Sequence, residues 1–207
     1  MSRYTLKGPA NWDETIRRSR FLVLASPATS PEQALAFIEA NSVPDATHNC
    51  WAYQIGDEYR FFDDGEPGGT AGRPILQAIQ GQQCDRVVVL VVRWFGGTKL
   101  GTGGLIRAYG GCAAQCLRQA DKIKIVEQVR IKCYCPFSDL ALVQSRFSAH
   151  HVRIIVEEFG ADGVDWTLTL PASLYDDFMV QFMNQTRGQG VCAIDSDDST
   201  GEPETTV

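Results

Sequence analysis

The sequence predicts an α+β fold in two domains followed by a short tail. Its 207 residues suit one large or two small domains, and a hydrophobic content of 44% is enough for a packed core. Strand-like and helix-like periodicities alternate along the chain, and the pattern begins again after a charged connection at residues 121–126. We therefore expect an N-terminal domain over residues 1–126, a second domain over 127–196 and a disordered acidic tail over 197–207.

The first half of the N-terminal domain is predicted to contain strands and one helix. Ser30 at the N-cap, Pro31 at the first helical position and Gln33 completing a capping box predict a helix that ends near residues 42–44. Gly56-Asp57 is a hairpin turn signal between two strand-like runs. The strands expected here span residues 4–7, 21–26, 48–55 and 58–62.

The second half of this domain contains two glycine-rich segments separated by one strand. The first segment spans Phe62–Pro74 and the second spans Arg93–Gly104. Between them, Val87–Val92 is an unbroken apolar run typical of a strand buried on both faces. Helices are expected over residues 74–80 and 103–120. Because glycine is costly to order, its clustering indicates sharp turns or a backbone that lies close to a ligand.

The second domain is predicted to have strands and helices in the order βαββαβ. Ser138 is expected at the N-cap of its first helix, and Gly188 is expected to end the second. This order is that of the ferredoxin-like split βαβ unit. Strands are expected at residues 129–135, 152–159, 164–170 and 191–195, and helices at 138–150 and 172–187.

The composition bears on the cellular location of the protein and on whether it holds a metal ion. No apolar run is long enough for a transmembrane helix, and the residues after Met1 form no secretory signal, so we expect a cytoplasmic protein with no membrane partner. The seven cysteines are scattered without paired zinc-like spacing. We expect them to be free thiols packed as small hydrophobes, and we expect no metal and no cofactor.

The net charge of −6 is unevenly distributed. Residues 1–126 carry 14 Lys and Arg against 12 Asp and Glu, a balance of +2, whereas residues 127–196 carry 5 against 9, a balance of −4. The last eleven residues add four acidic side chains and no basic one. The acidic balance therefore belongs to the C-terminal part, and it does not exclude a basic surface for nucleic acid on the N-terminal domain.

The second glycine-rich segment leaves a buried strand and enters a helix, a context suited to anion binding. Backbone N–H groups at a helix N-terminus are unpaired, and the helix dipole favours negative charge there. Neither the Walker A pattern nor the dinucleotide pattern G-x-G-x-x-G is complete, and the alternative is that these glycines only allow a tight turn and close packing. The candidate nucleic-acid or anion-binding residues are Arg73, Arg93, Trp94, Gly96, Gly97, Lys99, Gly101, Gly103, Gly104 and Arg107.

The first glycine-rich segment carries three carboxylates, at Asp63, Asp64 and Glu66. Carboxylates on a loop are suited to holding Mg²⁺ or to acid–base catalysis. Two structural alternatives stay open. The aspartates shape the turn and cap the following helix, or Asp64 or Glu66 forms an ion pair with Arg73 or Arg93.

Histidine and aromatic residues lie close to both segments in the sequence. His48 stands two residues before Cys50, but a structural histidine is favoured over a Cys–His catalytic pair. The aromatic side chains suit either single-stranded nucleic acid or the core. Trp94, which follows Arg93 at the end of the buried strand, is the aromatic residue expected to be exposed.

Together these motifs resemble the YigZ/IMPACT family. The resemblance is carried by Arg18–Phe21, by the D-D-G-E-P-G-G-T-A-G-R-P stretch at Asp63–Pro74, and by Arg93–Gly110. It implies an N-terminal two-layer α/β domain like the second domain of a ribosomal small-subunit protein and the fourth domain of elongation factor G, with a second domain like that factor's fifth. It also implies a link to translation, since eukaryotic members interfere with activation of an initiation-factor kinase.

Two functions follow from these observations. The favoured one is a non-enzymatic, translation-associated regulatory protein that binds RNA or the ribosome through the face bearing Arg73, Arg93 and Arg107. A protein partner in translation control is a further expectation. The alternative is an enzyme that acts on a small phosphorylated or acidic ligand between the two glycine-rich loops, with Asp64 or Glu66 as acid–base.

Overall fold

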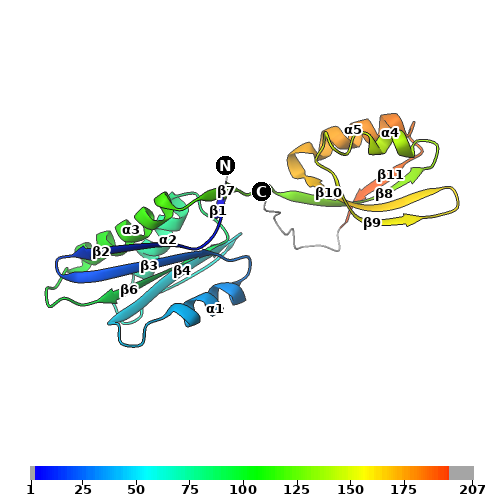
Figure 1. Cartoon of the computed structure of the whole chain (residues 1–207). Helices are drawn as coiled ribbons and strands as arrows, with labels where there is room; N and C mark the ends of the chain where they lie inside the picture. Colours follow the sequence, from blue (N-terminus) through cyan, green and yellow to red (C-terminus); the bar gives the residue numbers. More distant parts are fainter. Residues whose placement is uncertain (1–2, 196–207) are drawn as a thin grey trace. The chain divides into compact units, whose positions relative to one another are not determined.

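The structure, a computed structural model, describes residues 3–195, which divide into two compact units. One unit ends at Ile125 and the other begins at Val126 (Figure 1). The acidic tail predicted at 197–207 lies outside the described residues, so its disorder stays a prediction. Within the described residues, no helix is both long and apolar enough to cross a bilayer.

The N-terminal unit is built on a five-stranded antiparallel sheet with the order β2-β3-β6-β4-β5. Its strands are β2 (Ala10–Ile16), β3 (Ser19–Pro27), β4 (His48–Ile55), β5 (Glu58–Phe62) and β6 (Val87–Trp94). A separate pair joins β1 (Tyr4–Leu6) to β7 (Lys122–Lys124), so the predicted charged connection contains a short strand. β2 was not predicted, because it is a mostly exposed edge strand whose polar residues hide its β pattern.

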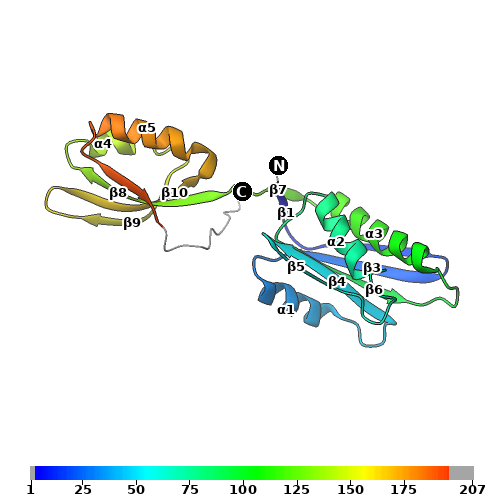
Figure 2. The same cartoon turned by 180° about the vertical axis from the view of Figure 1, so that it is seen from behind.

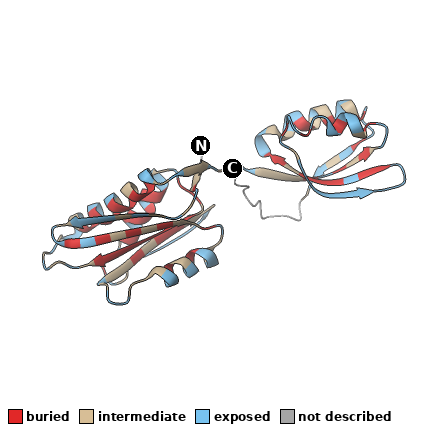
Figure 3. Cartoon of the chain, in the orientation of Figure 1, coloured by how far each residue is buried: buried red, intermediate tan, exposed pale blue. Residues whose placement is uncertain are grey.

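Helices cover both faces of this sheet. The helices α2 (Gly72–Gly81) and α3 (Thr102–Gln119) lie on one face, and α1 (Pro31–Asn41) lies on the other (Figure 2). The unit therefore has three layers, which corrects the two-layer expectation. The physical reason lies in β6, where Val87, Val89 and Val91 pack in the core under α2 and α3 while Val88 packs under α1. Figure 3 shows this burial on the central strands.

Short sequence signals predicted the start of several helices and one hairpin of this unit correctly. The Ser30 hydroxyl accepts a hydrogen bond from the Gln33 backbone N–H, which confirms Ser30 as the N-cap. The Gln33 side chain accepts from the Thr29 N–H, one residue before the N-cap, so the second bond of the predicted capping box is shifted by one residue. β4 and β5 pair in register across the two-residue turn at Gly56-Asp57, as predicted. Both helices that follow a glycine-rich segment begin within two residues of the predicted position.

The C-terminal unit has the predicted element order. It contains β8 (Gln128–Pro136), α4 (Leu140–Gln144), β9 (Arg153–Phe159), β10 (Gly163–Pro171), a 3₁₀ turn at Ala172–Leu174, α5 (Tyr175–Gln185) and β11 (Val191–Ile194). The four strands are ordered β11-β8-β10-β9, every neighbour is antiparallel, and both helices lie on one face (Figure 1). This unit has a core of its own around Trp166 and Phe178.

The first helix of this unit is shorter than predicted. The expected helix over 138–150 is regular only through the five residues of α4. The N-cap position belongs to Asp139 and not to Ser138, and no side chain caps it. The Ser145 hydroxyl donates to the Leu142 carbonyl, a local bond of the kind that competes with helix continuation.

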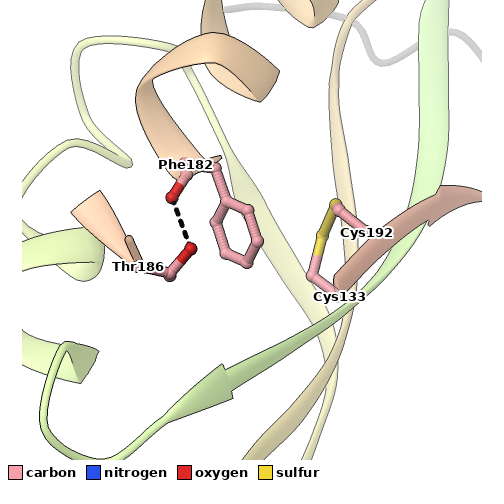
Figure 4. The surroundings of a disulfide bond; sticks show 4 residues. All are labelled: Cys133, Phe182, Thr186 and Cys192. Carbon is pink, nitrogen blue, oxygen red and sulfur yellow. Dashed lines mark hydrogen bonds between the residues drawn. A yellow bond between two sulfur atoms is a disulfide. The ribbon is translucent and has the colours of Figure 1, made fainter. Parts of the chain in front are cut away.

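Two of the cysteines are paired, which corrects the expectation of seven free thiols. Cys133 on β8 and Cys192 on β11 stand opposite one another in register and form a disulfide (Figure 4). They are 59 residues apart, so only the strand pairing brings them together. The other five cysteines are free and buried.

Candidate functional site

The two glycine-rich segments leave the same end of the five-stranded sheet. β4 and β6 are antiparallel, and His48 at the start of β4 pairs with Arg93 near the end of β6. β5 ends beside Trp51 of β4, so the segment that follows β5 emerges at this same end. We call residues 63–71 and 95–104 the glycine-rich end.

Asp63 caps the N-terminus of α2. One of its carboxylate oxygens accepts hydrogen bonds from the backbone N–H groups of Ala71 and Gly72 at 3.0 and 2.8 Å, and the other accepts from Gly69 at 2.8 Å. A Cβ at Gly72 would lie 2.7 Å from the Phe62 backbone, so this close return of the chain requires glycine. The negative charge therefore sits on the helix N-terminus, where the dipole stabilises it.

Asp64 fixes the start of β4. Its carboxylate accepts from the Asn49 backbone N–H at 2.5 Å, and its carbonyl oxygen lies 2.7 Å from His48 Nδ1. Because a carbonyl oxygen only accepts, Nδ1 carries the proton in this contact. The other ring nitrogen, Nε2, lies 3.7 Å from a Glu66 oxygen. His48 is thus held by the first glycine-rich segment, as the structural interpretation predicts.

Glu66 and Arg93 form a buried ion pair. The Arg93 guanidinium donates to Glu66 Oε1 at 2.5 Å and to the Ser19 hydroxyl at 3.2 Å, and the Tyr109 hydroxyl donates to the same Glu66 oxygen at 2.7 Å. Both charged side chains are about 95% buried, with 4% and 5% exposed. Arg93 is therefore not part of an exposed basic face, which corrects that part of the prediction. The ion pair between Glu66 and Arg93 was one of the alternatives left open.

The thiol beside this pair is kept neutral. Burial raises the pKa of Cys50 to about 12, and its sulfur lies 3.4 Å from the Tyr109 hydroxyl. Burial also raises the pKa of Tyr109 above its ordinary value. Since a nucleophilic cysteine needs a lowered pKa, Cys50 has the properties of a core residue.

The second glycine-rich segment approaches the turn between β2 and β3. A Cβ on Gly96 would lie 1.8 Å from the Arg18 carbonyl oxygen, and the Gly96 N–H donates to the Ser19 hydroxyl at 3.3 Å. Gly97 and Gly101 have φ values of 82° and 74°, which favour glycine. The loop thus depends on glycine at several positions. Within it, Gly97, Lys99, Gly101 and Gly103 are exposed, and Gly96 and Gly104 are half-buried.

Several cations near this end point to solvent. Arg73, Lys99 and Arg107 are exposed, as the sequence predicted. The structure adds Arg17 and Arg18, which are exposed at the β2–β3 turn and have φ values of 45° and 72°. Their position was not predicted from the sequence, because the turn that carries them exists only where β2 pairs with β3. The sequence signal for their position is the pair Arg17-Arg18 itself, which forms a two-residue turn between β2 and β3.

Trp94, the aromatic residue predicted to be exposed, is not among the exposed aromatic residues. Trp94 is half-buried, and the Arg20 guanidinium lies 4.9 Å from its ring centroid. Phe95 of the second glycine-rich segment is 45% exposed, and Phe62 at the start of the first is 50% exposed. Among residues 3–195, no cluster of three or more His, Cys, Asp or Glu is arranged to hold a metal ion.

Comparison with known proteins assigns the chain to a family. Residues 17–117 match the Impact N-terminal domain, and residues 133–189 match a domain of unknown function, DUF1949. An IMPACT family member of Thermus thermophilus is 52% identical over 75% of this chain and 86% of its own length. IMPACT family member YigZ of Escherichia coli is 33% identical over 87% and 91%. The crystal structure of a hypothetical protein is 31% identical, with a TM-score of 0.68 over 95% of this chain and 98% of its own. The chain belongs to the IMPACT family.

Proposed function

We propose that this chain is a translation-associated regulatory protein that binds RNA or the ribosome through its glycine-rich end. One observation carries the proposal. The acidic side chains Asp63 and Glu66 are occupied by the α2 N-terminus and by Arg93, whereas Arg73, Lys99 and Arg107 remain exposed. A surface with exposed cations and inward carboxylates suits a phosphate backbone.

Family membership supports the translation side of the proposal. The N-terminal unit carries the Impact N-terminal domain, and the resemblance links that domain to translation control in eukaryotes. We also infer that the N-terminal unit is related to the second domain of a ribosomal small-subunit protein. For the C-terminal unit, the order β11-β8-β10-β9 with antiparallel neighbours supports a ferredoxin-like fold. A cytoplasmic location belongs to the same proposal.

The geometry does not favour the enzyme alternative. Glu66 already accepts hydrogen bonds from Arg93 and Tyr109, and the Asp64 carboxylate accepts one from the Asn49 N–H. An acid–base catalyst must instead reach a proton of its substrate. We therefore propose the binding function alone.

The test is co-sedimentation of the purified protein with ribosomes and RNA across a salt series. The informative variant is Arg73→Ala, Arg107→Ala, since Arg93 is needed inside the fold. The matched control is Arg118→Ala, Arg187→Ala, which removes the same charge from exposed positions on α3's last turn and in the second unit.

We expect the wild-type affinity to fall with salt. The plot of log affinity against log salt should be shallower for the Arg73/Arg107 variant, by roughly 0.7 to 0.9 for each phosphate contact removed. The control should match the wild type. Equal binding by all three proteins, or equal losses in both variants, contradicts the proposal. An absence of RNA and ribosome binding at low salt redirects the search to a protein partner in translation control.

A further inference from the structure

Phe95 is an apolar ring held rigidly at the surface of the glycine-rich end. It is 45% exposed, although it directly follows the buried strand β6. Its backbone N–H donates to the Thr47 hydroxyl at 2.9 Å, which fixes it to the segment before β4. A single exposed phenylalanine is ordinary on a protein surface, so only its surroundings can make this one a binding site.

A fixed cation lies under the ring. The Arg93 guanidinium is 5.6 Å from the Phe95 ring centroid, within the range of a cation–π contact. That guanidinium cannot swing away, because Glu66 and Ser19 hold it in the core. The ring therefore has a rigid support, which a flexible surface side chain lacks.

The chain beside the ring carries no side chains. Gly96 and Gly97 follow Phe95, and a Cβ on Gly97 would meet nothing within 4 Å. A substitution at Gly96 would collide with the Arg18 backbone, so that position stays bare. Open space therefore lies beside the backbone at Gly97, two residues after the exposed ring, in the same loop that carries Lys99 and leads to Arg107.

We propose that Phe95 is a stacking platform for an unpaired nucleobase, so that the RNA recognised by the glycine-rich end is single-stranded. This inference rests on the proposed function and names its partner more closely. An aromatic face stacks any base, but only a base that is not already stacked and paired within a duplex can reach it. In this arrangement Lys99 and Arg107 contact phosphates, and Phe95 contacts a base.

Phosphate contacts and base stacking can be distinguished by experiment. Phosphate contacts release counterions, so they set the slope of affinity against salt, whereas a stacking contact changes the affinity at every salt concentration without changing that slope. The probes are a fluorescein-labelled oligouridylate and an RNA duplex of the same length, titrated by fluorescence anisotropy with the full-length chain.

We expect Phe95→Ala to weaken oligouridylate binding roughly 5- to 150-fold, the loss of one stacked base, with an unchanged salt slope. Phe95→Trp should bind at least as tightly as the wild type. The control Phe159→Ala removes another exposed phenylalanine, in the second unit, and should have no effect. Arg107→Ala should reduce the salt slope for both probes.

Each possible failure has a distinct meaning. If the wild type binds the oligouridylate and Arg107→Ala weakens it while Phe95→Ala does not, the stacking platform is overturned and the proposed function stands. A wild-type preference for the duplex also overturns the platform. If the wild type binds neither probe nor ribosomes, both the platform and the proposed function fail.

Discussion

At the scale of single residues, the Glu66–Arg93 pair is the centre of the glycine-rich end. Burying two charges costs several kcal/mol per ion in desolvation, which the attraction and the hydrogen bonds of the pair must offset. Ser19 and Tyr109 supply two of these hydrogen bonds. Arg93 Nε is buried without a hydrogen-bond partner among the residues that the structure describes, so the guanidinium is held through its two terminal nitrogens. The pair connects the first glycine-rich segment to the end of β6 and thereby fixes where the second segment begins.

Breaking this pair should destabilise the protein strongly. Glu66→Gln leaves the Arg93 charge buried without a counter-charge, so we expect a loss of about 3–5 kcal/mol in the free energy of unfolding. Urea denaturation followed by circular dichroism measures it. Glu39→Gln, at an exposed position of α1, is the matched control and should change little. A loss below about 1 kcal/mol would show that the pair is not a structural element.

The buried thiols predict how stability depends on alkaline pH. Burial raises the pKa of Cys50 and of Cys112 from 9.0 to about 12. Above pH 9 the unfolded chain releases these protons and the folded chain keeps them, so the free energy of unfolding should fall between pH 9 and 12. The Cys50→Ala, Cys112→Ala variant should show a shallower fall in the same urea titrations. An equal fall in both proteins would refute the assignment.

The sequence could name these residues but not their partners. It singled out Glu66 and Arg93 as charged residues of two adjacent loops, and it left an ion pair between them as one alternative. Choosing that alternative requires the register that brings β4, β5 and β6 to a common end, since the two residues are 27 positions apart. Phe95 was missed for a related reason, because only the packing of Arg20 on Trp94 shows which of the two neighbouring rings is covered.

At the scale of elements, α2 and α3 start at the same end but in different ways. The N-terminus of α2 is filled by the Asp63 carboxylate. The N-cap of α3 is Gly101, which offers no side-chain acceptor. The two helices therefore present different electrostatic environments, although each follows a glycine-rich loop.

Removing the α2 cap should cost stability. Asp63→Ala leaves three backbone N–H groups without their acceptor, so we expect a loss of about 2 kcal/mol, at the upper end for an N-cap. Asp63→Asn keeps one acceptor oxygen and should fall between this variant and the wild type. Differential scanning calorimetry compares them with Asp45→Ala, an exposed control. Identical unfolding temperatures for Asp63→Ala and the control would count against the cap.

Substitution of glycine by alanine should have opposite effects on stability in the tightly packed loop before α3 and in the middle of α3. Gly96→Ala places a Cβ against the Arg18 carbonyl, so we expect it to destabilise the protein by about 1–3 kcal/mol. Gly111→Ala, in the middle of α3 with nothing within 4 Å, should stabilise it by about 1 kcal/mol. Chemical denaturation of the two variants and the wild type measures these changes in the free energy of unfolding. A stabilising Gly96→Ala would mean that the close approach of the two loops is not required.

Element prediction succeeded where a local signal was strong. The Ser30 N-cap of α1, the two-residue turn between β4 and β5 and the apolar run of β6 each fix an element by short-range chemistry. It failed for β2, because a polar edge strand is stabilised by its backbone pairing with β3. It overextended α4, where the Ser145 hydroxyl donates to the Leu142 carbonyl in competition with the helix.

At the scale of the whole molecule, the two units have separate cores. The β1–β7 pair closes the N-terminal unit, since β7 follows α3 and returns to the first strand of the chain. The boundary of this unit therefore lies after β7. Composition along the chain indicated the boundary region, but it did not reveal that the charged connection contributes a strand.

Truncation should reveal the importance of this closing strand. A fragment ending at Ile125 keeps β7 and should unfold cooperatively, whereas a fragment ending at Ala120 loses it and should unfold at a lower temperature. Thermal unfolding monitored by circular dichroism compares the two fragments. Equal unfolding temperatures would mean that the β1–β7 pair contributes nothing to the unit.

The inward carboxylates of the glycine-rich end have a consequence for the first moments of an encounter. Glu66 is paired with Arg93, and Asp63 accepts hydrogen bonds at the α2 N-terminus. In contrast, Arg73, Lys99 and Arg107 are exposed. On the proposed function, the N-terminal unit therefore presents its outward positive charge at this end, within a chain of net charge −6. The electric field of a polyanion orients a protein with such a charge asymmetry before the two molecules come into contact. The N-terminal unit should then meet RNA with its glycine-rich end first, and added salt should slow the association rate more than it speeds dissociation.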